Sequence, residues 1–177
     1  MNSNLKTRSS IQCPDGSAAS SDQEKAELLD SYFASAFSDD SFPSLEPGVP
    51  VHMLEDIEIT PSIVFDVLNK LKSDKSPGPE GWPIRVFKEC SEQLSVPLSI
   101  LFTKFFQSGG LPSDWKIVFV SPIHKKGSQH LAGNYRPASL TSTVVKVMES
   151  IVKYNVLEHL SFYNLISPCQ FGFLAGH

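Results

Sequence analysis

Two neighbouring segments predict the only β-structure of this chain: residues 116–127 read KIVFVSPIHKKG, and residues 134–141 read NYRPASLT. The β-branched and aromatic residues at 116–123 favour a strand. Residues 135–140 form a second extended candidate, in which Pro137 is tolerable at the edge of a sheet. Because only a polar loop separates the two candidates, we expect a short antiparallel β-hairpin.

Helices are predicted on both sides of this hairpin by apolar residues at helical spacing. Ser21 and Glu24 fit a capping box, in which each side chain satisfies a free backbone N–H group. The predicted helix starts are Ser21, Thr60, Pro83, Pro97 and Ser142, and Gly109-Gly110 ends the fourth helix. The predicted fold class is therefore α+β, mostly helical, with one short antiparallel β-hairpin.

The composition excludes several classes of protein. The chain has 177 residues, is 41% hydrophobic and carries a net charge of −4. No apolar run approaches the roughly 20 residues that span a bilayer, and residues 1–10 lack the apolar stretch of a signal peptide. We therefore expect an intracellular protein of the cytoplasm or nucleus, neither secreted nor bound to a membrane.

The charge is unevenly distributed along the sequence. Residues 1–66 hold 3 basic and 12 acidic residues, a net charge of −9, whereas residues 67–177 hold 12 basic and 7 acidic residues, a net charge of +5. No carboxylate occurs between Asp114 and Glu149. This asymmetry favours a polyanionic partner for the basic part, and a solvated basic surface is the alternative.

Lys125, Lys126 and Arg136 are the candidate binding residues of the hairpin. If the strands pair, these cations converge at one end, where Gly127 and Gly133 would allow backbone N–H groups to approach a ligand. Lysine offers a point charge and arginine a planar pair of donors, a combination that suits a triphosphate or a nucleic-acid backbone. An exposed turn with solubilising lysines remains the alternative.

Cysteine and histidine residues predict neither a disulfide framework nor a metal site. Cys13, Cys90 and Cys169 are widely spaced and form no C-x-x-C motif, and the five histidines show no paired-ligand spacing.

Four segments in a fixed order carry a resemblance to a known family. They are KSPGPEG at 75–81, WKIVFVSPIHKKG at 115–127, NYRPASLT at 134–141 and SPCQFGF at 167–173. This series resembles the start, or fingers part, of the reverse transcriptase domain of non-LTR (LINE-like) retrotransposons of the jockey, chicken-repeat and RTE kind. The resemblance covers residues 11–177, since the segment EKAELLDSYFASAF also looks like the helix that precedes that domain.

The resemblance implies roles for particular residues. The S-P-G-P-[DE]-G segment lies against template RNA in the family, which makes Ser76, Pro77, Gly78 and Gly81 template-binding candidates. The two hairpin blocks hold the incoming triphosphate or the template, which implies that role for Lys125, Lys126 and Arg136. Gln170, Gly172 and Phe173 match the segment where the fingers pass toward the palm.

The resemblance also implies a division of the chain and a limit on its activity. Residues 1–20 are expected to be a disordered lead-in, 21–74 a helical segment, and 75–177 a truncated fingers part without palm or thumb. The family's two metal-binding aspartate motifs are absent, and the F-S-D-D sequence at 37–40 precedes the fingers motifs and is therefore out of order.

We therefore expect a fragment of an RNA-directed DNA polymerase without a catalytic residue or cofactor of its own. Mg²⁺ is expected only for a complete enzyme, with the palm and thumb of the same polymerase as missing partners. A residual RNA-binding module that uses the basic hairpin, and an inert unstable fragment, are the alternatives.

Overall fold

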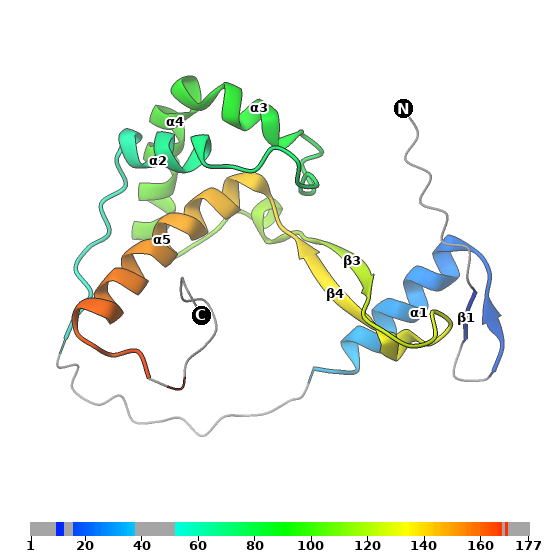
Figure 1. Ribbon diagram of the computed structural model, residues 1–177. Helices are drawn as coiled ribbons and strands as arrows, with labels where there is room; N and C mark the ends of the chain where they lie inside the picture. The colour runs from blue at the N-terminus through cyan, green and yellow to red at the C-terminus, as the bar shows by residue number, and fades with distance from the viewer. Residues whose placement is uncertain (1–9, 13–15, 38–51, 168, 170–177) are drawn as a thin grey trace. The chain divides into compact units, whose positions relative to one another are not determined.

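The computed structural model describes residues 10–12, 16–37, 52–167 and 169, and these residues fall into two compact units (Figure 1). One unit comprises residues 1–45 and 120–139, and the other comprises residues 46–119 and 140–177. Gln170, Gly172 and Phe173 lie outside the described residues, as do Cys13 and positions 38–40. Within the described residues, no helix has both the length and the apolar character that crossing a bilayer requires.

The first unit is built around one helix and a small hairpin near its start. Strands β1 (Ile11–Gln12) and β2 (Ala18–Ala19) pair antiparallel, with Ile11 opposite Ala19. Both residues of this pair are buried, at 1% and 2% exposure. These strands lie within residues 1–20, which the sequence predicts to be a disordered lead-in. Two-residue strands are too short to show a periodic pattern, so the sequence gives no signal for them.

Helix α1 (Asp22–Ala34) begins at the predicted capping box. Ser21 Oγ accepts a hydrogen bond from the Glu24 N–H at 3.1 Å, and Glu24 Oε2 accepts from the Ser21 N–H at 3.0 Å and the Ser20 N–H at 2.8 Å. The backbone N–H groups of Ser21 and Ser20 lower the pKa of the Glu24 carboxyl. The local sequence alone therefore predicts this helix start correctly.

The second unit contains the main apolar core. Helix α2 (Pro61–Asn69) contacts helices α4 (Ser91–Ser108) and α5 (Thr143–Phe162), and the short α3 (Ile84–Glu89) precedes α4 (Figure 1). The core consists of Ile59, Val64, Leu68, Leu98, Phe102, Val147, Met148 and Ile151. Trp115 adds edge-on ring contacts, at 6.0 Å from Phe102 and 4.9 Å from Phe105. Packing of three helices around these side chains is the main source of stability of this unit.

Helix α4 differs from its prediction at the start. The sequence predicts a start at Pro97, since proline favours the first turn of a helix, but Pro97 lies inside a helix that begins at Ser91. Buried residues at 91, 95, 98 and 102 continue at helical spacing across the proline. Burial of that stripe offsets the backbone hydrogen bond that proline removes. The predicted end is confirmed, because Gly109 caps the helix with φ of 65°.

Strands β3 (Phe119–His124) and β4 (Tyr135–Leu140) form the predicted hairpin, and β4 matches its predicted bounds. The 3₁₀ helices η1 (Ser113–Lys116) and η2 (Ala132–Asn134) precede the two strands, so that β3 begins three residues later than predicted. Both strands cross the boundary between the units, at 119/120 and at 139/140. The described chain is thus mixed helix and strand, consistent with the α+β prediction.

Helix α5 receives its cap from a distant residue. Its own N-cap residue, Ser142, makes no side-chain capping hydrogen bond. Instead Glu80 Oε1 accepts a hydrogen bond of 2.7 Å from the Thr143 N–H, across 63 residues of sequence. Burial raises the pKa of the Glu80 carboxyl, but Thr143 and Ser142, acting on the carboxylate, lower the pKa by more, so that the net shift is downward.

The cap predicts a pH-dependent contribution to stability. We expect Glu80→Gln to lower the free energy of unfolding at pH 7 by about 0.5–1 kcal/mol, the range for a partly exposed charge at a helix N-terminus. Because the folded-state pKa of Glu80 is lowered, this difference is full above the ordinary glutamate pKa and disappears as the pH falls through the folded-state value.

Urea denaturation of both proteins across this acid range measures the effect. Glu89→Gln, on the exposed Arg85–Glu89 pair of α3, is the matched control and should cost less at every pH. A gap between Glu80→Gln and the parent protein that is independent of pH would contradict the proposed charge–helix interaction.

Candidate functional site

The tip of the β3–β4 hairpin is a closed and internally bonded loop. The Lys125 N–H donates to the Asn134 carbonyl at 2.8 Å, which closes residues 125–134 into one loop. The Asn134 side chain donates to the Ser128 carbonyl at 2.8 Å, and the Tyr135 hydroxyl donates to the Gln129 carbonyl at 2.8 Å. The first two residues of the N-Y-R-P segment therefore hold the shape of the loop.

The loop is also attached to strand β1 within the same unit. The Gln12 N–H donates to the His130 carbonyl at 2.8 Å, and His130 Nδ1 lies 2.6 Å from the Ser10 carbonyl. Beside the loop, the rings of His124 and Tyr135 meet edge-on at 5.4 Å. These contacts fix the backbone from which the predicted binding residues project.

Side chains of the protein itself fill the space beside the two loop glycines. Gly127 has φ of 81°, and a Cβ there would lie 2.9 Å from Asn134 Nδ2. A Cβ on Gly133 would lie 3.2 Å from the Tyr32 hydroxyl of α1. In the structure these exposed glycines make room for Asn134 and Tyr32, and their approach to a ligand stays a prediction.

Lys125, Lys126 and Arg136 are all exposed, and none forms an ion pair within the described part of the chain. The Lys125–Asn134 backbone bond places His124 opposite Tyr135, and alternation along the strands then puts Arg136 on the face opposite Tyr135. Lys125 falls on the same face as Arg136 by the same alternation. Lys125 and Arg136 therefore lie on the same face near the tip of the hairpin, and Lys126 follows Lys125 in the loop.

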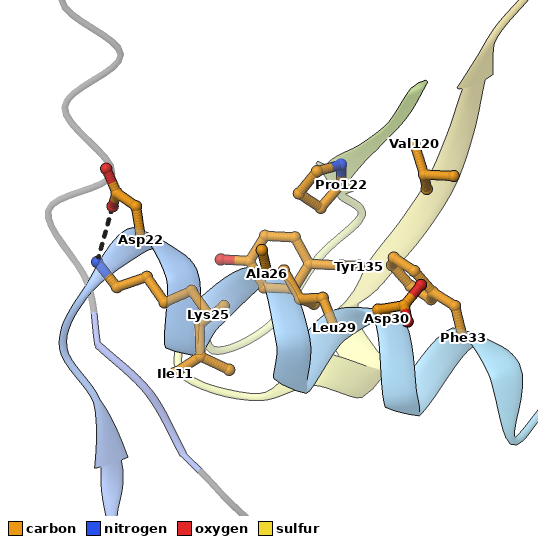
Figure 2. Close-up of a pocket in the computed structure, with 10 residues that line it drawn as sticks. All are labelled: Ile11, Asp22, Lys25, Ala26, Leu29, Asp30, Phe33, Val120, Pro122 and Tyr135. Atoms are coloured by element: carbon orange, nitrogen blue, oxygen red, sulfur yellow. Dashed lines mark ion pairs between the residues drawn. The ribbon is translucent and has the colours of Figure 1, made fainter. Parts of the chain in front are cut away.

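The other face of the hairpin, toward α1, is apolar. Val120, Pro122 and Tyr135 line a cavity of about 350 Å³ together with Leu29 and Phe33 of α1 (Figure 2). Lys25 crosses the end of this cavity with its side chain 11% exposed, and its Nζ lies 3.7 Å from Asp22 Oδ1 at the surface. Lys25 thus buries its stem while its charge meets the Asp22 carboxylate at the surface.

The loop at 76–81 lies against the start of α5. Gly78 is buried, and a Cβ on it would collide with the Thr141 carbonyl oxygen and lie 2.9 Å from Ser142 Cα. Gly81 has φ of 71° and donates its N–H to the Gly78 carbonyl at 3.0 Å. Ser76, Pro77 and Gly81 are exposed. Of the four template candidates, Gly78 therefore serves close packing, and the other three present a surface.

The predicted site residues fall in both units. Lys125, Lys126 and Arg136 belong to the first unit, and residues 76–81 belong to the second. Within the described residues, no group of three or more His, Cys, Asp or Glu side chains could hold a metal ion.

Three residues hold the candidate loops in place, a role that the sequence did not predict. They are Glu80, Asn134 and Tyr135, although each lies within a segment that the sequence marks as special. For Glu80, the missing signal was available: Ser142 precedes a first helical turn without acidic residues, which leaves that helix start in need of an anionic partner.

Comparison with curated proteins shows similarity along most of the chain. The probable RNA-directed DNA polymerase from transposon BS of Drosophila melanogaster is 25% identical over 179 residues, which cover 94% of this chain and 20% of that protein. The RNA-directed DNA polymerase from mobile element jockey of Drosophila funebris is 26% identical over 96% of this chain and 20% of that protein.

A relative outside the insects matches as well. The transposon TX1 uncharacterized 149 kDa protein of Xenopus laevis is 30% identical over 75% of this chain and 10% of its own length. No protein-family model matches the chain. The chain spans about a fifth or less of the length of the relatives described here.

The similarity extends over nearly the whole chain, and the matched proteins named as polymerases come from non-LTR retrotransposons. The chain is therefore similar, over most of its length, to the RNA-directed DNA polymerases of non-LTR retrotransposons.

Proposed function

We propose that these 177 residues are the part of a retrotransposon RNA-directed DNA polymerase that holds nucleic acid or the incoming triphosphate, corresponding to the fingers. The single observation that carries this proposal is the group of three exposed cations without ion-pair partners at the end of the β3–β4 hairpin. The related polymerases support it, since 94–96% of the chain matches the transposon BS and Drosophila funebris jockey proteins.

The chemistry of the hairpin supports contact with phosphate. Lys125 and Lys126 offer mobile ammonium groups, and Arg136 offers a planar fork that can donate two parallel hydrogen bonds to one phosphate. Since no described carboxylate neutralises them, binding a polyanion would not first require breaking an ion pair. The loop is closed by its own hydrogen bonds, so that little order remains to be gained on binding.

The loop at 76–81 is proposed to contact the template strand. Ser76, Pro77 and Gly81 are exposed on it, while Gly78 and Glu80 attach it to α5. Exposed backbone in a rigid proline–glycine loop suits contacts to sugar and phosphate, which position a strand without reading its sequence. We propose a division at 20/21 and at 74/75, with the loop opening the polymerase part.

Substitution of the cations tests the proposal. We expect Lys125→Ala/Lys126→Ala/Arg136→Ala to weaken binding of single-stranded RNA at least tenfold. The slope of log K against log salt should become less negative by about 2, because three cations are removed and each phosphate contact contributes about −0.7. Fluorescence anisotropy with a labelled oligonucleotide at several salt concentrations gives both values.

The control variant carries the same change of charge elsewhere. Lys72→Ala/Lys88→Ala/Lys104→Ala lies in the other unit and should keep more of the affinity and more of the salt slope. Equal losses in the two triple variants would show that only net charge matters, and the hairpin would then not be the site.

Polymerisation is proposed to need more than these 177 residues. Two divalent metal ions held by carboxylates activate the attacking hydroxyl and stabilise the leaving group in nucleotide transfer. We expect no template-dependent primer extension by the purified 177-residue chain with either Mg²⁺ or Mn²⁺. A product that lengthens with time and depends on the template would overturn this expectation.

Exposed apolar side chains support a second candidate, an unstable fragment that needs the palm and thumb of the same polymerase. Side chains at 117, 118, 119, 120 and 123 are 39–55% exposed around strand β3. Such a surface is typical of a covered interface or of an aggregation-prone segment. We expect broad, non-cooperative urea unfolding for this candidate, whereas a single cooperative transition followed by circular dichroism would refute it.

A further inference from the structure

A groove between α2 and α5 is lined by apolar and acidic residues that have no part in the proposed binding of nucleic acid. It has a volume of about 750 Å³ and lies entirely within the second unit. Its floor is apolar, with Ile63, Val67 and Leu71 from the α2 side and Ile151 from α5. These side chains also pack on or belong to the main core, so that the floor is a fixed part of the fold.

The rim of the groove is strongly acidic. Asp56, Glu58 and Asp66 line one side and Glu158 of α5 lines the other, against one basic residue, Lys70. All five are exposed, and none forms an ion pair with any described residue. Four unpaired carboxylates around an apolar floor repel nucleic acid and anionic lipid, which leaves a cationic and partly apolar occupant.

An aromatic side chain adds to this surface. Tyr154 of α5 lines the groove and is 67% exposed. Large, stiff side chains of this kind supply much of the binding energy in protein interfaces, because they bury area at a small entropic cost. The other apolar residues of the groove are half-buried or buried, so that Tyr154 is the part of the lining most available to a partner.

We propose that this groove docks a basic amphipathic helix, with the apolar stripe of the helix on the floor and its lysines or arginines against the acidic rim. An amphipathic helix in a groove between two helices is a recurrent mode of peptide recognition. The chain's stretches at 38–51 and 168–177 contain no lysine or arginine, and residues 1–9 carry Lys6 and Arg8 with only two apolar residues, so that none of these stretches supplies both the charge pattern and an apolar stripe. The occupant is therefore a segment outside the 177 residues.

A defined probe tests the proposal on the full 177-residue chain. The probe is a labelled helical peptide of leucine and lysine, with leucine at i, i+3, i+4 and i+7, and its counterpart has glutamate in place of lysine. We expect the basic peptide to bind, with an affinity that falls as salt increases, and the acidic peptide not to bind. Asp66→Lys/Glu158→Lys should weaken binding at least tenfold, and Tyr154→Ser several-fold.

Matched variants separate the groove from general charge effects. Asp74→Lys/Glu149→Lys changes the net charge equally, but neither residue lines the groove, and we expect it to bind within about twofold of the parent protein. Because all substituted side chains are exposed, circular dichroism should show an unchanged fold. Equal loss of peptide binding in the two charge-reversed proteins would overturn the proposal. So would peptide binding that is unchanged by Tyr154→Ser and displaced by spermine to the same extent in the parent protein and in this variant.

Discussion

The contact between Glu80 and the start of α5 is the constraint that fixes how the proline–glycine loop meets the core of the second unit. Helix α5 carries three residues of the main core, Val147, Met148 and Ile151, yet lacks a capping side chain of its own. Glu80 supplies the missing acceptor, and it can reach Thr143 because Gly78 lets the loop approach the backbone at Thr141 and Ser142. One carboxylate and one missing Cβ thus hold the proline–glycine loop to the helix that completes the core.

The predictions that the structure confirms rest on residues close together in the sequence. The capping box of α1, the Thr60 cap of α2, the Gly109 end of α4 and the bounds of β4 each follow from local patterns. The predicted start of α4 at Pro97 was wrong. Burial of the stripe before and after Pro97 outweighs the preference of proline for a first helical turn, and this burial is visible only once α2 is in place. The sequence shows that the start of α5 lacks an anionic residue of its own, but not that Glu80 supplies one, since the cap joins residues 63 positions apart.

The candidate site shows the same division between local and distant information. Strand pairing predicted that the hairpin cations would converge at one end, and the alternation along the paired strands places Lys125 and Arg136 on the same face. All three cations are exposed, as the alternative of a solvated turn also expects. The interpretation of Gly127 and Gly133 as openings toward a ligand stays a prediction, because a glycine that admits a ligand and a glycine that admits a neighbouring side chain look alike in sequence. Only the geometry shows that Asn134 occupies the space beside Gly127. The nucleic-acid roles of Lys125, Lys126 and Arg136 stay predictions.

The short link between β4 and α5 has a mechanical consequence. Strand β4 ends at Leu140 and α5 begins at Thr143, so that only Thr141 and Ser142 separate them. Tension applied to the hairpin tip would pass along an extended strand, which has almost no slack, directly to the first turn of α5. The load would fall on the hydrogen bond from Thr143 to Glu80 before it reached the apolar core. This bond would thus carry the load at the start of α5 if a strand held at the hairpin were pulled.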